Sequence, residues 1–170
     1  MVLGYNGPVH ATDSNHFAPV GITVRPIGAA DLRPLHAALF STQPFAQFQA
    51  HYRQFGRWQT CRRACWLVAV AGVHGLVGSG QLRCYPRRAE IANLIVAAAW
   101  RGQGIGAALV QSLVAAAQQL DWEAVEVLVA PTNGRAQTFY RRLGFTLTQT
   151  LQLTPGAPAL LLRKPLRGLS

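Results

Sequence analysis

Three glycines alternate with other residues in the segment Trp100-Arg-Gly-Gln-Gly-Ile-Gly-Ala107. Because glycine tolerates positive φ, this segment can curl until several backbone N–H groups point at one spot. A helix is expected to begin at Ile105, and the unpaired amides and the dipole of a helix start favour an anion. A pyrophosphate is the group that fits such a turn best. The alternative interpretation is a turn that needs positive φ and binds nothing.

Two other phosphate-binding patterns fit this turn poorly. A P-loop needs Gly-Lys followed by Ser or Thr, and the turn contains no lysine. Residues 102–107 satisfy the dinucleotide pattern G-x-G-x-x-A, but that turn normally closes the first strand of its domain. Here four expected strands precede it, and Glu126, the acid at about the right distance, falls inside a strand. The sequence therefore argues against an NAD site.

A second motif follows downstream, Asn133-Gly-Arg-Ala-Gln-Thr-Phe-Tyr-Arg-Arg-Leu-Gly-Phe145. With Arg101-x-x-Gly104-x-Gly106 before it, and one helix and one strand between, it resembles the paired motifs of the GNAT N-acetyltransferase superfamily. The resemblance covers roughly residues 22–163 and is strongest over 90–145. It implies an acetyl-CoA-dependent N-acetyltransferase that moves an acetyl group to a primary amine by direct transfer in a ternary complex.

The resemblance also implies where acetyl-CoA, the co-substrate, binds. The pyrophosphate would sit on the amides of the glycine turn, the pantetheine would pair with the strand before it, and Asn133 would contact the CoA arm. The implied cofactor-binding residues are Leu94, Ile95, Val96, Arg101, Gly102, Gln103, Gly104, Ile105, Gly106, Ala107, Asn133 and Tyr140. No metal is implied, and the three cysteines form no metal pattern.

Tyr140 is the leading candidate for the general acid, because the family pattern aims its hydroxyl at the CoA sulfur and a phenol can supply a proton to a thiolate. Packing beside Phe139 is the alternative role. Glu90 is the leading candidate for the base that deprotonates the amine, with ion pairing to neighbouring arginines as its alternative. Glu126 is the second choice, and members of this family also use water.

The elements that must position these residues follow from periodicity. Apolar residues at Ile105, Leu109 and Leu113 repeat with helical spacing, and the valine-rich run over 66–71 is typical of a buried strand. The sequence predicts strands at 21–26, 66–71, 76–84, 90–96, 124–129, 146–153 and 159–163, and helices at 31–40, 44–58, 105–120 and 134–143. The order β-α-α-β-β-β-α-β-α-β-β predicts an α/β fold, and the resemblance makes it a GNAT-like mixed, mostly antiparallel sheet of six or seven strands with helices on both faces.

Composition limits the partners. The chain has 170 residues, which suits a flexible leader over 1–20 and one domain over 21–170, and its net charge of +10 attracts anions. No carboxylate lies between Asp31 and Glu90, so the acceptor is expected to be neutral or anionic apart from its amine. No membrane span or secretory signal is visible, and a reduced, cytoplasmic protein is expected.

Other functions stay open at this point. The aromatic segment over 31–60 is explained by default as packing against the sheet, and otherwise as a pocket for an arylalkylamine or a protein N-terminus. The competing functions are a non-catalytic acyl-CoA-binding sensor and a basic RNA- or ribosome-associated module. Nucleic acid binding is disfavoured because the aromatics have core-like spacing. The resemblance allows a homodimer.

Overall fold

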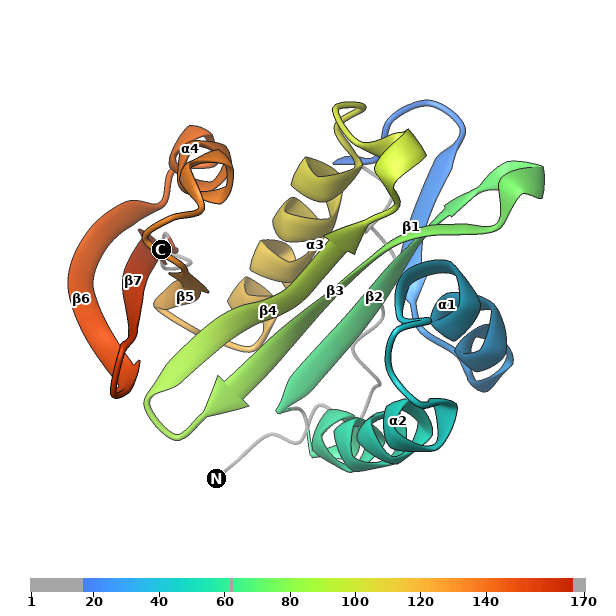
Figure 1. The fold of residues 1–170 in the computed structure, drawn as a ribbon, viewed down its shortest axis with the longest axis horizontal. Helices are drawn as coiled ribbons and strands as arrows, with labels where there is room; N and C mark the ends of the chain where they lie inside the picture. Colours follow the sequence, from blue (N-terminus) through green and yellow to red (C-terminus); the bar gives the residue numbers. More distant parts are fainter. Residues whose placement is uncertain (1–16, 62, 167–170) are drawn as a thin grey trace, which may run out of the picture.

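The structure is a computed structural model that describes residues 17–61 and 63–166. It shows a mixed sheet with helices on both faces (Figure 1). The elements are β1 (Ile22–Pro26), α1 (Leu32–Leu39), α2 (Phe45–Thr60), β2 (Ala64–Ala71), β3 (Leu76–Tyr85), β4 (Arg88–Val96), α3 (Ile105–Gln119), β5 (Ala124–Val129), α4 (Gly134–Arg142), β6 (Thr146–Thr154) and β7 (Ala157–Pro165). The predicted fold class and element order are confirmed.

The sheet has seven strands in the order β1-β2-β3-β4-β5-β7-β6. The pair β4–β5 is parallel, and the other neighbouring pairs are antiparallel. A parallel pair needs a crossover connection, which α3 supplies. The sheet is therefore mostly antiparallel, as predicted.

The parallel pair is short. Ala89 pairs with Val125 and Glu90 with Glu126, after which β4 continues to Val96 and β5 to Val129 as the strands diverge (Figure 1). Backbone N–H and C=O groups on the facing edges of these divergent ends are thus available to an inserted ligand. This wedge in the middle of the sheet is the feature that positions the site.

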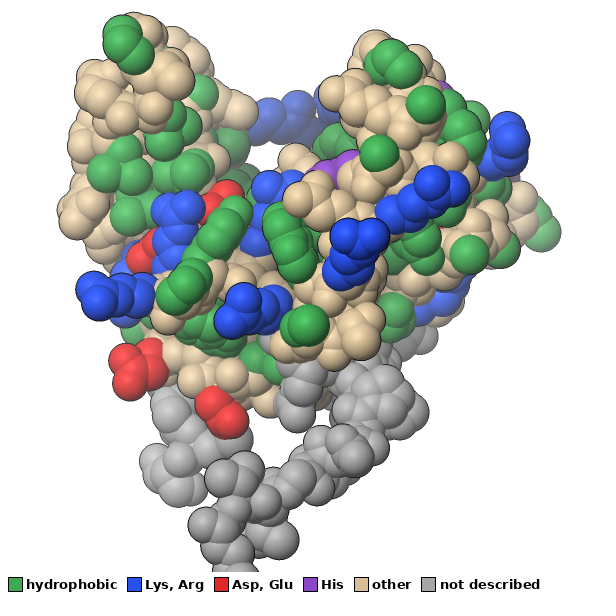
Figure 2. All heavy atoms as spheres, turned by 90° about the horizontal axis from the view of Figure 1, so that it is seen from below, with side chains coloured by type: hydrophobic (Ala, Val, Ile, Leu, Met, Phe, Trp, Pro, Cys, Tyr) green, Lys and Arg blue, Asp and Glu red, His purple; other side chains and the backbone are tan. Residues whose placement is uncertain are grey.

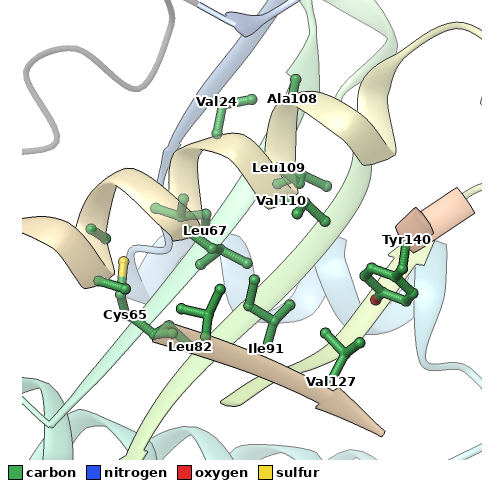
Figure 3. Packing of buried hydrophobic residues seen from close by; sticks show 14 of the residues in the cluster. Val24, Cys65, Leu67, Leu82, Ile91, Ala108, Leu109, Val110, Val127 and Tyr140 are labelled. Atoms are coloured by element: carbon green, nitrogen blue, oxygen red, sulfur yellow. The ribbon is translucent and has the colours of Figure 1, made fainter. Parts of the chain in front are cut away.

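Helix α3 packs on one face of the sheet, where Leu109 (Figure 3) and Leu113 are fully buried. Two glycines in β3 permit this close approach. A Cβ on Gly78 would come within 3.1 Å of Leu109 Cδ1, and one on Gly80 within 3.1 Å of Leu113 Cδ1. The small residues thus hold the helix that carries the glycine turn close to the sheet.

Helices α1 and α2 cover the opposite face with aromatic side chains. The rings of Phe48 and Phe55 lie 5.9 and 5.2 Å from Trp66 of β2, and the Trp66 indole N–H donates to Ser79 Oγ at 2.7 Å. Most of the aromatic segment is therefore core, which was the default interpretation of the sequence.

Both ends of α4 follow their local signals. The Asn133 side chain accepts a hydrogen bond from the amide of Ala136 at 3.0 Å, as an N-cap residue does. At the other end Gly144 has φ +84° and the amide of Phe145 donates to the carbonyl of Tyr140 at 3.1 Å. These two caps fix the helix that carries Tyr140.

Two expectations concern regions away from the site. Residues 1–16 of the expected leader lie outside the described residues, whereas Ala18 packs against the core and Pro19 lies beside Gly104. Cys61 and Cys65 do not share a helical face, because α2 ends at Thr60 and Cys65 lies in β2. The domain boundaries stay a prediction.

Candidate active site

A cleft of 880 Å³ lies between the end of β4, the glycine turn and α4. Most of the residues predicted to bind acetyl-CoA line it. They are Leu94, Ile95, Val96, Arg101, Gly102, Gly104, Gly106, Ala107, Asn133 and Tyr140. Two motifs that are about thirty residues apart in sequence thus face one space, as the resemblance implied.

Three predicted residues do not line the cleft. The Gln103 side chain donates to the carbonyl of Ala99 at 3.2 Å, and the Ile105 side chain is buried in the core. Both can face the cleft only through their backbone. Glu90 lies near the start of β4, away from the cleft.

The glycine turn has the backbone geometry that an anion cradle needs. Gly102 and Gly104 have φ of +79° and +83°, and Gly104 is the residue that precedes α3. The first amides of α3 have no partner within the helix and point back towards this turn. The Arg101 side chain donates to the carbonyl of Val96 at 3.0 Å and so ties the turn to the end of β4.

Helix α4 adds cations and an aromatic ring to the opposite wall. Arg135, Thr138, Phe139 and Arg142 line the cleft together with Tyr140. Their spacing of three and four residues places them on one helical face. None of these four residues was among the predicted site residues, although their spacing was a readable signal.

A bulge interrupts β4 at the edge of the cleft. The register with β3 shifts between Gln81–Ala92 and Ser79–Ile95, and Asn93 has φ +51°. Asparagine tolerates this left-handed conformation better than most residues. The bulge re-aims the strand just before Leu94, which sequence periodicity did not reveal.

Tyr140 reaches from α4 into the wedge between β4 and β5 (Figure 3). Its side chain is 8% exposed, and burial raises the pKa of its phenol to about 12. The ring contacts Phe139 and Phe145 edge-on, at 5.0 and 5.4 Å. Among the residues that the structure describes, the hydroxyl has no hydrogen-bond partner. It is a protonated phenol at neutral pH, at the border of the cleft.

The Glu90 side chain is 13% exposed. It also forms an ion pair with a neighbouring arginine, which was the alternative to its role as a base. Its carboxylate lies 3.5 Å from the Arg88 guanidinium. The strand register sets Glu90 directly beside Glu126 on one side and Arg83 on the other, and register partners share a face of the sheet. The two candidate bases are therefore neighbours, on the face that α1 and α2 cover.

Two of the three cysteines, Cys65 and Cys84, are poor nucleophiles. Burial raises the pKa of Cys65 to about 12 and that of Cys84 to about 11, so both are thiols at neutral pH. Among the described residues no group of His, Cys, Asp and Glu could hold a metal ion. Nor does that part of the chain contain a helix long and apolar enough to cross a membrane.

Three solved structures with the same fold illustrate the similarity, and two of them are named as N-acetyltransferases. Ard1 from Thermoplasma volcanium is 20% identical with a TM-score of 0.70, covering 87% of this chain and 99% of that one. Spermidine N-acetyltransferase from Vibrio cholerae, in complex with CoA and spermine, is 18% identical with a TM-score of 0.68, covering 86% and 96%. The ribosomal-protein-S18-alanine N-acetyltransferase from Escherichia coli is 16% identical with a TM-score of 0.64, covering 88% and 97%.

These identities show the fold alone, and a comparison with curated proteins finds no match. The family model for the acetyltransferase (GNAT) family matches residues 29–145, which is more than half of the chain and includes both motifs. The residues that line the cleft, the glycine turn and the strands β4 and β5 all lie within that match. The chain belongs to the GNAT acetyltransferase family and is an acetyl-CoA-dependent acyltransferase.

Proposed function

We propose that this protein transfers the acetyl group of acetyl-CoA directly to a primary amine, with both substrates bound at once. The observation that carries the proposal is that one cleft gathers the glycine turn, the divergent end of β4 and the Tyr140 phenol. Binding both reactants in one place removes most of the entropic barrier to the reaction.

The residues of the cleft suit the donor. The glycine turn offers backbone amides to the pyrophosphate, and Arg101, Arg135 and Arg142 add positive charge beside it. The unpaired edge of β4 at Leu94–Val96 can hydrogen-bond to the amide groups of the pantetheine arm. Asn133 uses its side-chain oxygen to cap α4, so its amide group remains to donate to that arm.

The reaction forms a C–N bond and breaks a C–S bond. Backbone amides near Leu94 would stabilise the oxyanion that develops when the amine attacks the thioester carbon. Tyr140 would donate a hydrogen bond and then a proton to the departing sulfur. The amine loses one proton and the sulfur gains one, so protons balance over the cycle.

Glu90 is the base that we propose for the amine proton. Because Glu90 lies outside the cleft, it would act through water rather than by direct contact. Glu126 is its register neighbour and can take the same role. Direct access by solvent water is the remaining route.

An acceptor panel tests the proposed function. Purified protein is mixed with acetyl-CoA and a set of amines and N-terminal peptides, and free CoA is followed with a thiol reagent. We expect release that depends on the amine. Tight CoA binding without release for any acceptor would instead identify an acyl-CoA-binding sensor.

A cytoplasmic location and a homodimer stay predictions.

A further inference from the structure

A second pocket, of 370 Å³, lies on the face of the sheet that α1 and α2 cover. It is lined by Phe40, Gln43, Gln47, Phe48, Ala50, His51, Gln54, Trp66, Gln81 and Asn93. Asn93 lines this pocket and the next residue, Leu94, lines the cleft, so neighbouring residues of the β4 bulge border the two spaces. In Figure 2 the molecule is hollowed between a lobe of α1 and α2 and a lobe of β6 and β7, with histidine on the wall of the former.

The side-chain groups that line this pocket are uncharged. Its polar groups are five side-chain amides and one imidazole, and its apolar groups are mainly the rings of Phe40, Phe48 and Trp66. Among these described lining residues there is no carboxylate, ammonium or guanidinium group. An ion placed here would lose its hydration without gaining an opposite charge, which is unfavourable.

A buried hydrogen-bond network organises the wall, and its charged member, the Arg83 guanidinium, lies behind Gln81 and does not itself line the pocket. Gln81 is 1% exposed, and its side-chain oxygen accepts from Asn93 Nδ2 at 3.0 Å and from Arg83 Nη2 at 2.8 Å. Its amide nitrogen is therefore the donor to His51 Nε2, 3.1 Å away. Burial and the nearby Arg83 charge lower the pKa of His51, which favours the neutral ring.

The same network ties the pocket to the thioester end of the cleft. Gln81 holds Asn93, and Asn93 is the residue whose positive φ forms the bulge. A molecule that fills the pocket would therefore contact Asn93. Its neighbour Leu94 is the residue whose backbone is proposed to face the acetyl group. The arrangement suits an acceptor whose body fills the pocket while its amine reaches across β4.

We propose that this pocket binds the acceptor and selects a primary amine with an uncharged body that carries hydroxyl or amide groups on an apolar frame. This inference rests on the proposed function and narrows it. Side-chain amides pair equally well with a phenolic hydroxyl and with the amide groups of a peptide. A polyamine is disfavoured because its second ammonium group would meet no carboxylate among the described residues that line this pocket.

The experiment compares four acceptors by kcat/KM at equal acetyl-CoA. Tyramine and alanyl-phenylalanine amide have uncharged polar bodies, spermidine is cationic, and glutamate is anionic. We expect one or both uncharged-body amines to exceed spermidine and glutamate by about tenfold or more, equivalent to about 1.4 kcal/mol. Which of the two is faster distinguishes a small arylalkylamine from a peptide N-terminus.

A charge placed in the pocket provides the second arm. Gln47 is exposed at the pocket wall, so Gln47→Glu adds a carboxylate without disturbing the core. We expect it to raise kcat/KM for spermidine relative to tyramine by about fivefold, the effect of about 1 kcal/mol. Gln49→Glu is the matched control, because Gln49 lies on the same helix but does not line the pocket.

The outcomes separate the two proposals. CoA release that is fastest with spermidine or glutamate overturns the inference and leaves the proposed function standing. If Gln47→Glu and Gln49→Glu change the acceptor preference equally, the assignment of acceptor binding to this pocket is overturned. Absence of release with every amine overturns the proposed function, and this inference with it.

Discussion

At the scale of single residues, Tyr140 carries the sharpest prediction. Its phenol is buried, lies at the cleft and stays protonated far above neutral pH. Tyr140→Phe keeps the ring contacts with Phe139 and Phe145 and removes the proton donor. We expect kcat to fall about 10²-fold, in the range of a general acid, while acetyl-CoA affinity stays nearly constant.

Tyr85→Phe is the control and should leave kcat unchanged, because Tyr85 lies outside the cleft, where the Arg88 guanidinium stacks on its ring.

The pH dependence of kcat adds a second readout for Tyr140. Because burial raises the pKa of Tyr140 to about 12, the phenol binds its proton more tightly in the folded protein. We therefore expect no loss of kcat from phenol ionisation between about pH 7 and about pH 10, where an ordinary tyrosine begins to ionise. Equal rates for the wild type and Tyr140→Phe would remove Tyr140 from the mechanism.

At the scale of elements, the turn before α3 depends on its backbone conformation. An alanine at Gly104 would have to hold φ near +83°, which disfavours the left-handed geometry by about 1–2 kcal/mol. Among the described residues the added methyl group meets only Pro19, at 3.4 Å, so backbone strain dominates the effect. We expect Gly104→Ala to raise the Kd for acetyl-CoA about five- to thirtyfold, measured by calorimetry.

Gly56→Ala is the matched substitution inside α2. A Cβ there meets no atom of the described residues within 4 Å, and the position has an ordinary helical backbone. We expect a gain of about 0.5–1 kcal/mol in the free energy of unfolding and no change in acetyl-CoA affinity. Equal Kd values for the two variants would mean that the turn does not hold the donor.

At the scale of the whole molecule, the net charge of +10 has a partial explanation. Arg101, Arg135 and Arg142 line the cleft and would attract the phosphates of acetyl-CoA. Other basic side chains, seen on the face of the molecule in Figure 2, contribute a more distant field. Such a field speeds encounter with anions but is screened by salt.

Arg135→Gln should therefore raise the Kd for acetyl-CoA about fivefold at low salt, the effect of an exposed charge pair of about 1 kcal/mol. The difference should shrink at high ionic strength, because the Debye length falls from about 30 Å at 0.01 M to about 3 Å at 1 M. Arg57→Gln removes the same charge from the last turn of α2, outside the cleft, and should change the Kd little. An identical effect of both variants would mean that only net charge matters.

Features that depend on local physics could be predicted from the amino-acid sequence alone. The strand Ala124–Val129 was predicted to the residue, and the other elements to within a few residues of their ends. The N-cap at Asn133 and the left-handed Gly144 follow from short-range hydrogen bonding and backbone freedom. The paired motifs also indicated the family, because their residues and spacing are specific to its fold.

Features that depend on strand register and long-range packing could not be predicted in this way and are seen in the folded chain. The wedge exists because β4 and β5 pair at Glu90–Glu126 and then diverge, which no periodicity encodes. The bulge at Asn93 is held by Gln81, and Gln81 in turn contacts His51, thirty residues earlier in the chain. Those contacts form only when α2 packs against the sheet, so the uncharged pocket beside the cleft is a property of the assembled fold.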